Sequence, residues 1–490
     1  MRISKLNKCT IIIVDEVNCK IKNLDVDMRR KLSNMFSYEV PGARFTPAVK
    51  LGRWNGKVSF FQLSGSTYIN LLNDILPVLI DNGYEVAVDD RRAEIAFEFN
   101  KVTNDTYKDI VWPDGHQLEG EPIILRDHQV DAINNYFDNP QSLQELSTSS
   151  GKTVITTALS RAAEPYGRSI IIVPNRSLVN QTREDYVNMG LDVGVFYGKE
   201  KDYDKTHTIC TWQSLSSLYK KTKKGEAPIN IIEFIKDVVC VIVDEAHTCK
   251  GSVLKELLCS TFANIPIRWG LTGTIPKEKF ESNALRVSIG DVVGKVSAAE
   301  LQKKGILSKC HIHIKQLQDN RVNKDYQGEL KYLLSDSDRL DQIAYMIDGI
   351  GDTGNTLVLI DRVNAGKELE ARLEGKAVFV SGTTKEKHRK EEYDKVRDED
   401  GKIIIATYGV AAVGINLPRL FNIVLIEPGK SFVRVIQSIG RGLRVAKDKD
   451  YVDIYDITSS CKFAKRHLTK RKQFYRDSEY PFKVEKIKWQ

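Results

Sequence analysis

Two short polar stretches have the residue types and the spacing needed to bind and hydrolyse a nucleoside triphosphate. Residues 146–153 read LSTSSGKT and end like a phosphate-binding loop. Backbone N–H groups of this loop and the Lys152 ammonium can cradle the β- and γ-phosphates, while the Thr153 hydroxyl can ligate Mg²⁺. Residues 244–247 read DEAH, where Asp244 can hold the metal and Glu245 can polarise an attacking water. Together the two stretches predict ATP as substrate and Mg²⁺ as cofactor.

The loop departs from the usual G-x-x-x-x-G-K-[ST] pattern, because Leu146 and Ser149 stand where glycines are common. The Gly-Lys-Thr core is intact, and we expect Ser149, Ser150 and Gly151 to face the phosphates. A helical pattern follows at residues 154–159. The phosphates would therefore lie at a helix N-terminus, where free N–H groups favour anions.

The elements that must position these residues are predicted to be parallel strands. The apolar run at residues 239–243, VCVIV, is typical of a strand buried on both faces of a parallel sheet. Similar runs at 169–173 and 208–211 alternate with helical patterns, and the alternation restarts at 356–360, 377–380, 403–407 and 423–426. This pattern predicts an α/β fold with two tandem, doubly wound parallel-sheet domains, at residues 111–298 and 299–458.

The first 110 residues are predicted to form a separate small α/β domain. The dipeptide NG at residues 55–56 predicts a tight turn between two strands. Arg44, Arg53 and Lys57 lie close to Trp54 and could meet the phosphates of a duplex. This domain is therefore a candidate DNA-binding appendage, although a hairpin with an ordinary basic rim would explain the same residues.

The last 32 residues, 459–490, are predicted to be a basic C-terminal segment. Lysines and arginines far outnumber acidic residues there, and aromatic residues are interleaved among them. Such a composition favours a nucleic-acid contact surface over a solvated helix.

Composition limits the class of protein. The chain has 490 residues, 41% hydrophobic and 28% charged, with a net charge of +8, as expected for a globular protein of about three domains. No stretch is long and apolar enough to span a membrane, and no cleavable leader is evident, so a cytoplasmic location is expected. The eight cysteines are scattered without a C-x-x-C pair, which argues against zinc and disulfides.

Further short polar segments follow the predicted strands in a definite order. Arg126 and Gln129 precede the phosphate loop with the spacing of an adenine-reading pair, and Thr272 and Thr274 follow the strand after Asp244. Candidate contacts to a nucleic-acid backbone are Pro174, Asn175, Arg176, Thr211, Trp212, Gln213, Ser381, Gly382, Thr407 and Tyr408. The series ends with Gly414 and with QSIGRGLR at residues 437–444.

This order resembles that of the superfamily-two helicases over roughly residues 124–458. The resemblance implies two RecA-like domains, with Lys152 and Glu245 in catalysis and Gly414 near the nucleotide. It also implies that Arg441 and Arg444, with Gln437 in the same motif, act on the γ-phosphate, where fixed guanidinium groups stabilise the transferring phosphoryl group. Thr272 and Thr274 would couple hydrolysis to domain motion.

Within the superfamily, the N-terminal residues R-F-x-P at 44–47 and GRWNGK at 52–57 resemble the UvsW-like bacteriophage recombination helicases. That resemblance implies an ATP-dependent helicase that remodels forks, junctions and displacement loops, working as a monomer or weak oligomer. An RNA helicase and a double-strand DNA translocase that does not separate strands remain open. A nucleic-acid-binding scaffold with an inactive nucleotide site is disfavoured, because the catalytic residue types are all present.

Overall fold

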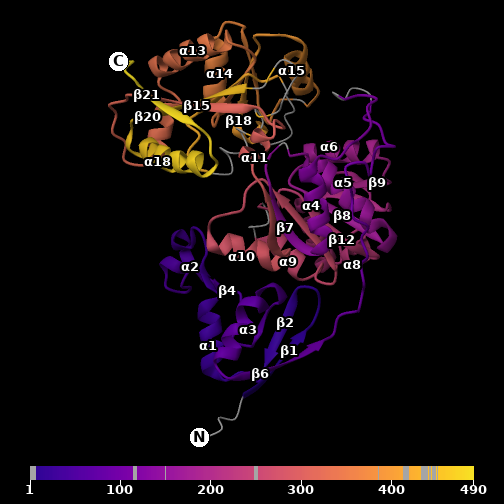
Figure 1. Cartoon of the computed structure of the whole chain (residues 1–490). Coiled ribbons are helices and arrows are strands. Elements are labelled where there is room, and N and C mark those ends of the chain that lie inside the picture. Colours follow the sequence, from indigo (N-terminus) through magenta and orange to yellow (C-terminus); the bar gives the residue numbers. More distant parts are fainter. Residues whose placement is uncertain are drawn as a thin grey trace. The chain divides into compact units, whose positions relative to one another are not determined.

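The computed structural model describes residues 7–113, 118–148, 150–247, 252–384, 386–411, 419–431, 440, 443, 449 and 451–489 (Figure 1). It divides into two compact units, residues 1–146 with 152–295, and residues 147–151 with 296–490. Five of the predicted site residues lie outside the described residues: Ser149, Gly414, Gln437, Arg441 and Arg444.

The first unit begins with a four-stranded sheet in the order β5-β2-β1-β6. Its strands are β1 (Asn7–Ile13), β2 (Asn18–Lys22), β5 (Ser66–Tyr68) and β6 (Tyr84–Asp90), and β1 pairs with β6 in parallel. The helices α1 (Val26–Met35) and α3 (Leu72–Asp81) pack their apolar faces on this sheet (Figure 1). The short helix α2 (Pro47–Lys50) lies between β3 (Ser37–Glu39) and β4 (Lys57–Ser59), which pair antiparallel.

This N-terminal sheet is a sheet of its own, and it also packs against the domain that follows it. Ala284 and Val287 of α10 (Lys279–Ser288) are fully buried members of its apolar core. Three polar contacts lie at the same boundary: Glu16 N–H to the Ala263 carbonyl, Asn18 Nδ2 to the Cys259 carbonyl and Asn70 Nδ2 to the Arg286 carbonyl, each 2.9 Å. A second apolar face on α10 therefore joins the N-terminal sheet to the next domain.

The rest of the first unit is an eight-stranded sheet in the order β10-β9-β11-β8-β12-β13-β7-β14. Neighbours from β9 to β7 in this order are parallel, as predicted, and the short β10 pairs antiparallel with its neighbour β9. The strands are β7 (Gln141–Leu146), β8 (Arg168–Val173), β9 (Val193–Tyr197), β10 (Glu200–Asp202), β11 (His207–Thr211), β12 (Val238–Val243), β13 (Ile267–Thr272) and β14 (Asp291–Val296).

Helices cover this sheet, and their buried side chains form an apolar core together with those of the strands. Buried side chains of α7 (Trp212–Lys224), α8 (Ile231–Phe234), α9 (Ser252–Cys259) and α10 pack against alternate residues of β8 and β12. The helices α4 (Asp127–Asp138), α5 (Lys152–Ala163) and α6 (Arg176–Asn188) complete the unit, and α5 and α6 both contact β8.

The second unit contains a seven-stranded sheet in the order β17-β18-β16-β19-β20-β15-β21, and all its recorded pairings are parallel. The strands are β15 (Lys309–Leu317), β16 (Thr356–Ile360), β17 (Ala377–Val380), β18 (Ile403–Thr407), β19 (Asn422–Ile426), β20 (Tyr451–Ser459) and β21 (Phe482–Ile487). Its helices are α11 (Ala298–Lys303), α12 (Tyr326–Leu333), α13 (Ser337–Gly351), α14 (Val363–Arg372), α15 (Glu386–Asp398), α16 (Tyr408–Ala411) and α18 (Lys462–Asp477). The predicted fold class is confirmed by both sheets.

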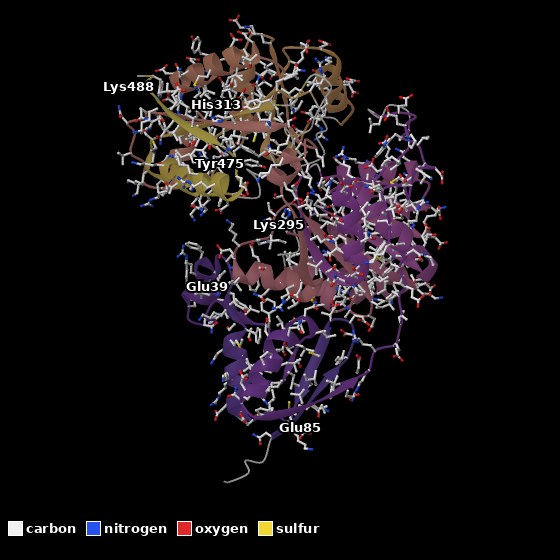
Figure 2. All side chains as sticks on the ribbon, viewed as in Figure 1. Glu39, Glu85, Lys295, His313, Tyr475 and Lys488 are labelled. Atoms are coloured by element: carbon white, nitrogen blue, oxygen red, sulfur yellow. The ribbon has the colours of Figure 1, made fainter. Side chains whose placement is uncertain are left out.

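The segment that the sequence sets apart at residues 459–490 is integral to this second unit. The helix α18 contacts β20, and β21 pairs with β15 as the last strand of the sheet (Figure 1). Tyr475, labelled in Figure 2, is fully buried on α18 together with Arg471. The aromatic and basic residues of this segment therefore serve partly as core, because the buried positions of α18 recur every three or four residues along one face of the helix.

No helix among the described residues has the length and apolar character needed to cross a membrane. Within the same residues, no group of three or more His, Cys, Asp or Glu side chains is placed to hold a metal ion.

Candidate nucleotide and nucleic-acid site

Three strands of the first unit bring the predicted catalytic residues to one edge of the sheet. The neighbouring strands β12, β13 and β7 end at Val243, Thr272 and Leu146. Because the three strands are parallel, the residues after each strand emerge at the same carboxyl edge. Asp244 follows β12 directly, and α5 begins at Lys152.

A chain of polar contacts joins Lys152 to the end of β13. Lys152 Nζ lies 3.2 Å from Glu245 Oε1, and Glu245 Oε2 lies 3.3 Å from His247 Nδ1. His247 Nδ1 is also 2.9 Å from Thr272 Oγ1, which donates to the Thr274 carbonyl at 3.0 Å. The Glu245 carboxylate is thus held between the Lys152 ammonium and the Thr272 segment. His247 is the residue whose bridging role the sequence did not reveal, although it stands within the DEAH stretch.

The backbone at Glu245 adopts a rarely populated conformation. Its φ is +48°, in the left-handed region that non-glycine residues seldom occupy. The Glu245 N–H donates to Asp244 Oδ1 at 2.8 Å, which stabilises this turn. Backbone strain of this kind, of about 1–3 kcal/mol, persists where surrounding structure fixes it and is concentrated at functional sites.

Burial and neighbouring charges shift the pKa values of Asp244 and Glu245 in opposite directions. Burial, reinforced by the neighbouring Glu245 carboxylate, raises the pKa of Asp244. For Glu245, burial acts in the same direction, but the Lys152 ammonium and His247 outweigh it, so the pKa of Glu245 is lowered. Glu245 is therefore ionised, as a residue that orients and polarises water must be.

The oxygen donors at this edge fit Mg²⁺. A hard, strongly hydrated cation takes one or two protein oxygens and completes its shell with water and substrate phosphates, so it needs no dense cluster of ligands. The Asp244 carboxylate and the Thr153 hydroxyl on the first turn of α5 are such donors. Mg²⁺ held there would neutralise charge on the phosphates.

The adenine-reading pair lies at the start of α4. Gln129 is buried, and its Oε1 accepts from the Arg126 N–H at 2.9 Å, while the Arg126 side chain is exposed. The Gln129 amide is thus fixed in orientation, as selective hydrogen bonding to a base requires. Gly151 has φ +83°, a conformation that glycine adopts without strain, immediately before α5.

The two predicted nucleic-acid segments of the first unit meet in one pocket. Gln213 Nε2 donates to the Pro174 carbonyl at 3.2 Å. The pocket beside them has a volume of about 450 Å³ and is lined by Asn175, Arg176, Phe196, Gly198, Lys201, Thr211, Gln213, Ser214, Ser217, Leu218, Lys221 and Pro228. Asn175 and Thr211 cap α6 and α7, which fixes the loops that carry them.

Three cations make this pocket suited to a polyanion. Arg176 lines it, and so do Lys201 on β10 and Lys221 on α7, two residues that sequence analysis missed. Lys201 Nζ lies 3.8 Å from the centre of the Phe196 ring. Burial and the Lys221 charge lower the pKa of Lys201, which indicates that the cations are close enough to repel each other. A bound phosphate would relieve that repulsion.

Two predicted contacts are placed differently from the expectation. Tyr408 is buried at the start of α16, and its hydroxyl donates to the Ile426 carbonyl at 3.3 Å. Trp212 packs partly against the apolar core of the first unit and does not line the pocket. Both aromatic side chains fill space beneath their loops. The Tyr408 side chain is therefore not exposed to a ligand, and contact of Tyr408 and Trp212 with nucleic acid stays a prediction.

The remaining predicted contacts lie on separate surfaces. In the second unit, the Ser381 side chain is buried and hydrogen-bonds Thr383, Gly382 is exposed, and Thr407 is half-buried at the end of β18. In the stretch that leads from β3 into β4, the side chains of Arg44, Arg53 and Lys57 are exposed.

The predicted tight turn at residues 55–56 does not join a two-residue hairpin. The paired strands β3 and β4 are separated by residues 40–56, which include α2. Trp54 is half-buried because its Nε1 donates to the Lys57 carbonyl at 2.8 Å. Phe45, by contrast, is 65% exposed with the Arg44 guanidinium 4.8 Å from its ring centre.

Comparison with known proteins shows what the successive parts of the chain resemble. Three family models match the chain: "DNA helicase UvsW, N-terminal" at residues 12–89, "Type III restriction enzyme, res subunit" at 122–277 and "Helicase conserved C-terminal domain" at 338–446. The ATP-dependent DNA helicase uvsW of Enterobacteria phage T4 is 24% identical over 468 residues, which cover 91% of this chain and 89% of that protein.

Two further relatives are more distant. The DNA 3′-5′ helicase XPB of Kineococcus radiotolerans is 21% identical over 372 residues, covering 74% of this chain and 64% of that protein. Among solved structures, S. cerevisiae Dbp5 bound to RNA and ADP BeF3 superposes with a TM-score of 0.52 and 14% identity, over 75% of this chain and 90% of that chain. The last likeness bears on the fold alone.

Proposed function

Because the chain belongs to the superfamily-two ATP-dependent helicases, we propose that it uses ATP to move on DNA and to remodel branched DNA such as forks, junctions and displacement loops. The observation that carries the ATP-dependent part is the contact chain from Lys152 through Glu245 and His247 to Thr272. It unites a phosphate-binding cation, an ionised water-polarising carboxylate and a threonine segment at one sheet edge.

The residues of this edge divide the chemistry among them. When ATP binds, Lys152 exchanges its contact with Glu245 for the β- and γ-phosphates. Asp244 and Thr153 would hold Mg²⁺, which would neutralise charge on the phosphates. Glu245 is then free to orient water toward the γ-phosphate. His247 remains in contact with Glu245 and Thr272, so a change at the carboxylate reaches the end of β13. We assign the γ-phosphate contact to Arg441 and Arg444, following the family resemblance.

DNA is the proposed track because of the pocket and the relatives. The pocket near Asn175 and Thr211 offers polar caps and three cations to a phosphodiester backbone. Binding of this kind depends strongly on salt and weakly on sequence. The T4 relative, similar over nearly the whole chain, is a DNA helicase, and the family model that matches residues 12–89 is named for a DNA helicase.

Recognition of branched DNA is assigned to residues 43–57, which lead from β3 into β4. The exposed Arg44, Arg53 and Lys57 could contact a second duplex arm, as Phe45 could by stacking on an unpaired base. RNA is the second candidate track, because the shared fold also occurs in an RNA-bound protein.

The test is ATP hydrolysis by the purified protein with equal concentrations of single-stranded DNA, linear duplex, four-way junction or RNA duplex. We expect the largest stimulation with the junction. Lys152→Ala should lower turnover by at least about 10²-fold, since it removes the phosphate-binding charge, and should leave DNA binding unchanged. Lys101→Ala, which alters an exposed lysine paired with Asp138, is the matched control.

Each other outcome has a definite meaning. Equal stimulation by plain duplex would favour a translocase that does not separate strands, and preference for RNA would reassign the track. Turnover retained in Lys152→Ala would contradict the nucleotide site itself.

A further inference from the structure

The helix α10 connects the candidate nucleotide site of the first unit to the N-terminal sheet. Residues 272–274 follow β13 at the carboxyl edge, and α10 begins at Lys279, so that only residues 275–278 separate the two. Pro276 stands within this connection, where it fixes its own φ and restricts the residue before it. The connection is therefore short and stiff, and we expect a shift of α10 to move residues 272–274.

Thr272 is the last member of the contact chain that begins at Lys152. Its Oγ1 lies 2.9 Å from His247 Nδ1 and accepts from the Thr274 N–H at 3.3 Å. The side chains of Thr272 and Thr274 are both buried. A displacement of Thr272 therefore changes the contacts of His247, which in turn lies beside the Glu245 carboxylate.

One face of α10 is held by the N-terminal sheet and its helices. Ala284 and Val287 are buried in the apolar core of that sheet, and Phe280 packs against the same core. The Arg286 guanidinium pairs with the Asp74 carboxylate of α3. Apolar packing and an ion pair thus fix α10 from the N-terminal side.

The other face of α10 belongs to the core of the eight-stranded sheet. Leu285 and Ile289 are buried there, among side chains of β8 and β12. The Ser288 carbonyl accepts from Nη2 of the buried Arg268 at 2.7 Å. The helix is therefore a member of two cores at once, and close-packed interiors of this kind transmit displacement because they are hardly compressible.

Phe60 joins α10 to the stretch that is proposed to bind DNA. It follows β4 directly, and β4 begins with the exposed Lys57 of the 43–57 stretch. The buried Phe60 ring lies 5.8 Å from the Phe280 ring of α10, measured between ring centres. Lys255 Nζ of α9 lies 4.4 Å from the centre of the same Phe60 ring and helps to hold it in place. A shift of β4 therefore reaches α10 through two packed rings.

We propose that Phe60 and Phe280 are positioning residues for DNA-stimulated ATP hydrolysis, through which DNA held by residues 43–57 sets the place of Thr272. This proposal rests on the function proposed above. Every residue of the connection belongs to the first unit. The N-terminal sheet thus reports a bound DNA branch to the nucleotide site, in addition to holding the branch. Coupling between two sites of one protein typically amounts to about 5- to 150-fold.

The test is Phe280→Leu, which keeps an apolar side chain in the N-terminal core and removes the ring contact with Phe60. The ratio of ATP turnover with a four-way junction to turnover without DNA should fall by about fivefold or more. The junction concentration for half-maximal stimulation should change less than about twofold, because the proposed DNA contacts are untouched. Phe97→Leu is the matched control, since its half-buried ring packs on Phe99 and Tyr166, outside α10 and the N-terminal core.

Two further measurements separate positioning from a general loss of stability. In the double variant Phe60→Leu with Phe280→Leu, the stimulation ratio should be no lower than in the more affected single variant, because both changes remove one contact. In the wild type, the bound junction should slow hydrogen exchange of the Thr274 amide, which donates to Thr272 Oγ1. Phe280→Leu should abolish that response.

The proposal is overturned by an unchanged stimulation ratio in Phe280→Leu, by a parallel loss of junction affinity, by an equal loss in Phe97→Leu, or by additive losses in the double variant. A wild-type protein that no DNA stimulates would instead refute the proposed function. The response of the Thr274 amide to bound junction would still decide whether the connection exists.

A second variant covers the case in which Phe280→Leu does not fold. Asp74→Asn weakens the hold of α3 on Arg286 at a partly exposed ion pair, so the fold should tolerate it. Asp291→Asn is its control, because Asp291 pairs with the same guanidinium from outside the N-terminal sheet. Normal stimulation in Asp74→Asn, or an equal loss in the two variants, would contradict the proposal.

Discussion

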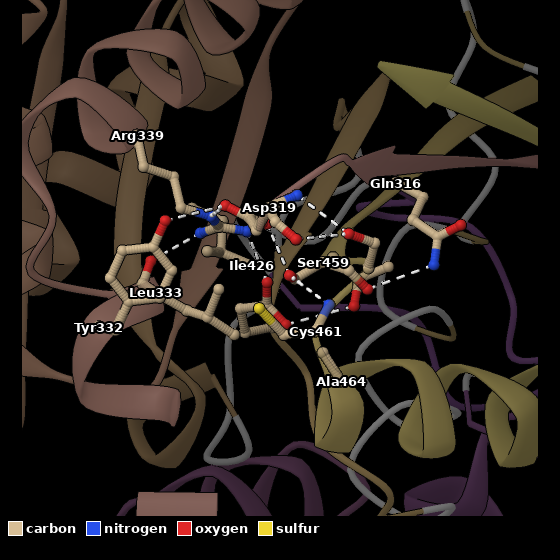
Figure 3. A network of polar contacts seen from close by, with 12 residues as sticks. Gln316, Asp319, Tyr332, Leu333, Arg339, Ile426, Ser459, Cys461 and Ala464 are labelled. Atoms are coloured by element: carbon tan, nitrogen blue, oxygen red, sulfur yellow. Dashed lines mark hydrogen bonds and ion pairs between the residues drawn. The ribbon is translucent and has the colours of Figure 1, made fainter. Parts of the chain in front are cut away.

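The two parallel sheets use charge at their carboxyl edges in opposite ways. In the first unit, Lys152 and Glu245 lie 3.2 Å apart with side chains 12% and 18% exposed. In the second unit, Arg339 and Glu427 lie 2.7 Å apart with side chains 0% and 5% exposed. Figure 3 shows Arg339 in its buried network, where Nε also lies 3.3 Å from Asp319 Oδ1. A ligand can reach the first pair and separate its two side chains. The second pair is closed off from solvent and from any ligand.

The difference shows how one architecture supports two tasks. A partly exposed ion pair contributes little to stability, so exchanging it for contacts with a phosphate carries a small penalty. A sealed pair depends on complete pairing, because an unpartnered charge in the same place is strongly destabilising. We therefore expect substitutions in the first group to affect turnover and those in the second to affect stability.

The largest effect is expected for Glu245→Gln in the first unit. The amide keeps the volume of the side chain but cannot polarise water as a carboxylate does, so kcat should fall by roughly 10²–10⁴-fold. Nucleotide binding, followed with a fluorescent analogue, and thermal stability should change little. Glu256→Gln on the exposed face of α9 is the control. A large fall in the melting temperature of Glu245→Gln would show that the Lys152–Glu245 pair stabilises the fold, and the contrast with the Arg339–Glu427 pair would then be wrong.

A smaller effect, this time on stability, is expected for Arg339→Met in the second unit. The substitution leaves Asp319 and Glu427 buried without their counter-charge, and loss of about 3–5 kcal/mol in the free energy of unfolding follows. Hydrogen exchange of β19 and β20 under increasing denaturant measures it for this unit alone. Arg372→Met, which removes more exposed ion pairs, should lower stability by at most about 1 kcal/mol. Equal losses in the two variants would contradict the special place of Arg339.

The smallest effect is a dependence of stability on pH. Burial raises the pKa of Glu427 to about 7, against the opposing influence of Arg339 and Arg471. The folded unit thus binds this proton more tightly than the unfolded chain, in which the group titrates near 4.5. Its stabilisation is fully present below pH 4.5 and is lost as the pH rises through about 7.

Glu427→Gln should remove this dependence. The difference in unfolding free energy between the variant and the wild type should change by about 1–3 kcal/mol between pH 4.5 and 8. Glu399→Gln, at an exposed carboxylate of the same unit, should show no such change. A constant difference across this range would show that Glu427 stays ionised throughout.

Much of the fold was accessible from the sequence, because buried parallel strands have a strong signal. The runs at residues 377–380 and 403–407 became β17 and β18 with the predicted bounds. The strand β21 was missed because FKVEKI alternates with charges, as an edge strand does, inside a segment whose basic composition suggested a surface. The docking of α10 on the N-terminal sheet was missed because a helix with two apolar faces resembles any other buried helix.

The candidate site, like the fold, contains residues that could be predicted from the sequence and residues that could not. Lys152, Asp244 and Glu245 stand in short motifs after recognisable strands, so their meeting at one edge follows from parallel topology. The burial of the Tyr408 side chain was not predicted, because only tertiary packing decides whether an aromatic residue after a strand faces solvent or core. Lys201 and Lys221 carry no motif, and their convergence depends on the lengths of β10 and α7.

The order of strands in the second sheet has a consequence for how the protein is made. Its first strand, β15, begins at Lys309, and the neighbour that covers its outer edge, β21, ends at Ile487. At synthesis rates of roughly 5–20 residues per second, that edge stays unpaired on the nascent chain for about ten to thirty seconds. A polypeptide interrupted before residue 471 lacks the strand β21. It also lacks Arg471, whose buried guanidinium donates to the Gly429 carbonyl. Unfinished chains should therefore be inactive as motors and prone to aggregate through β15.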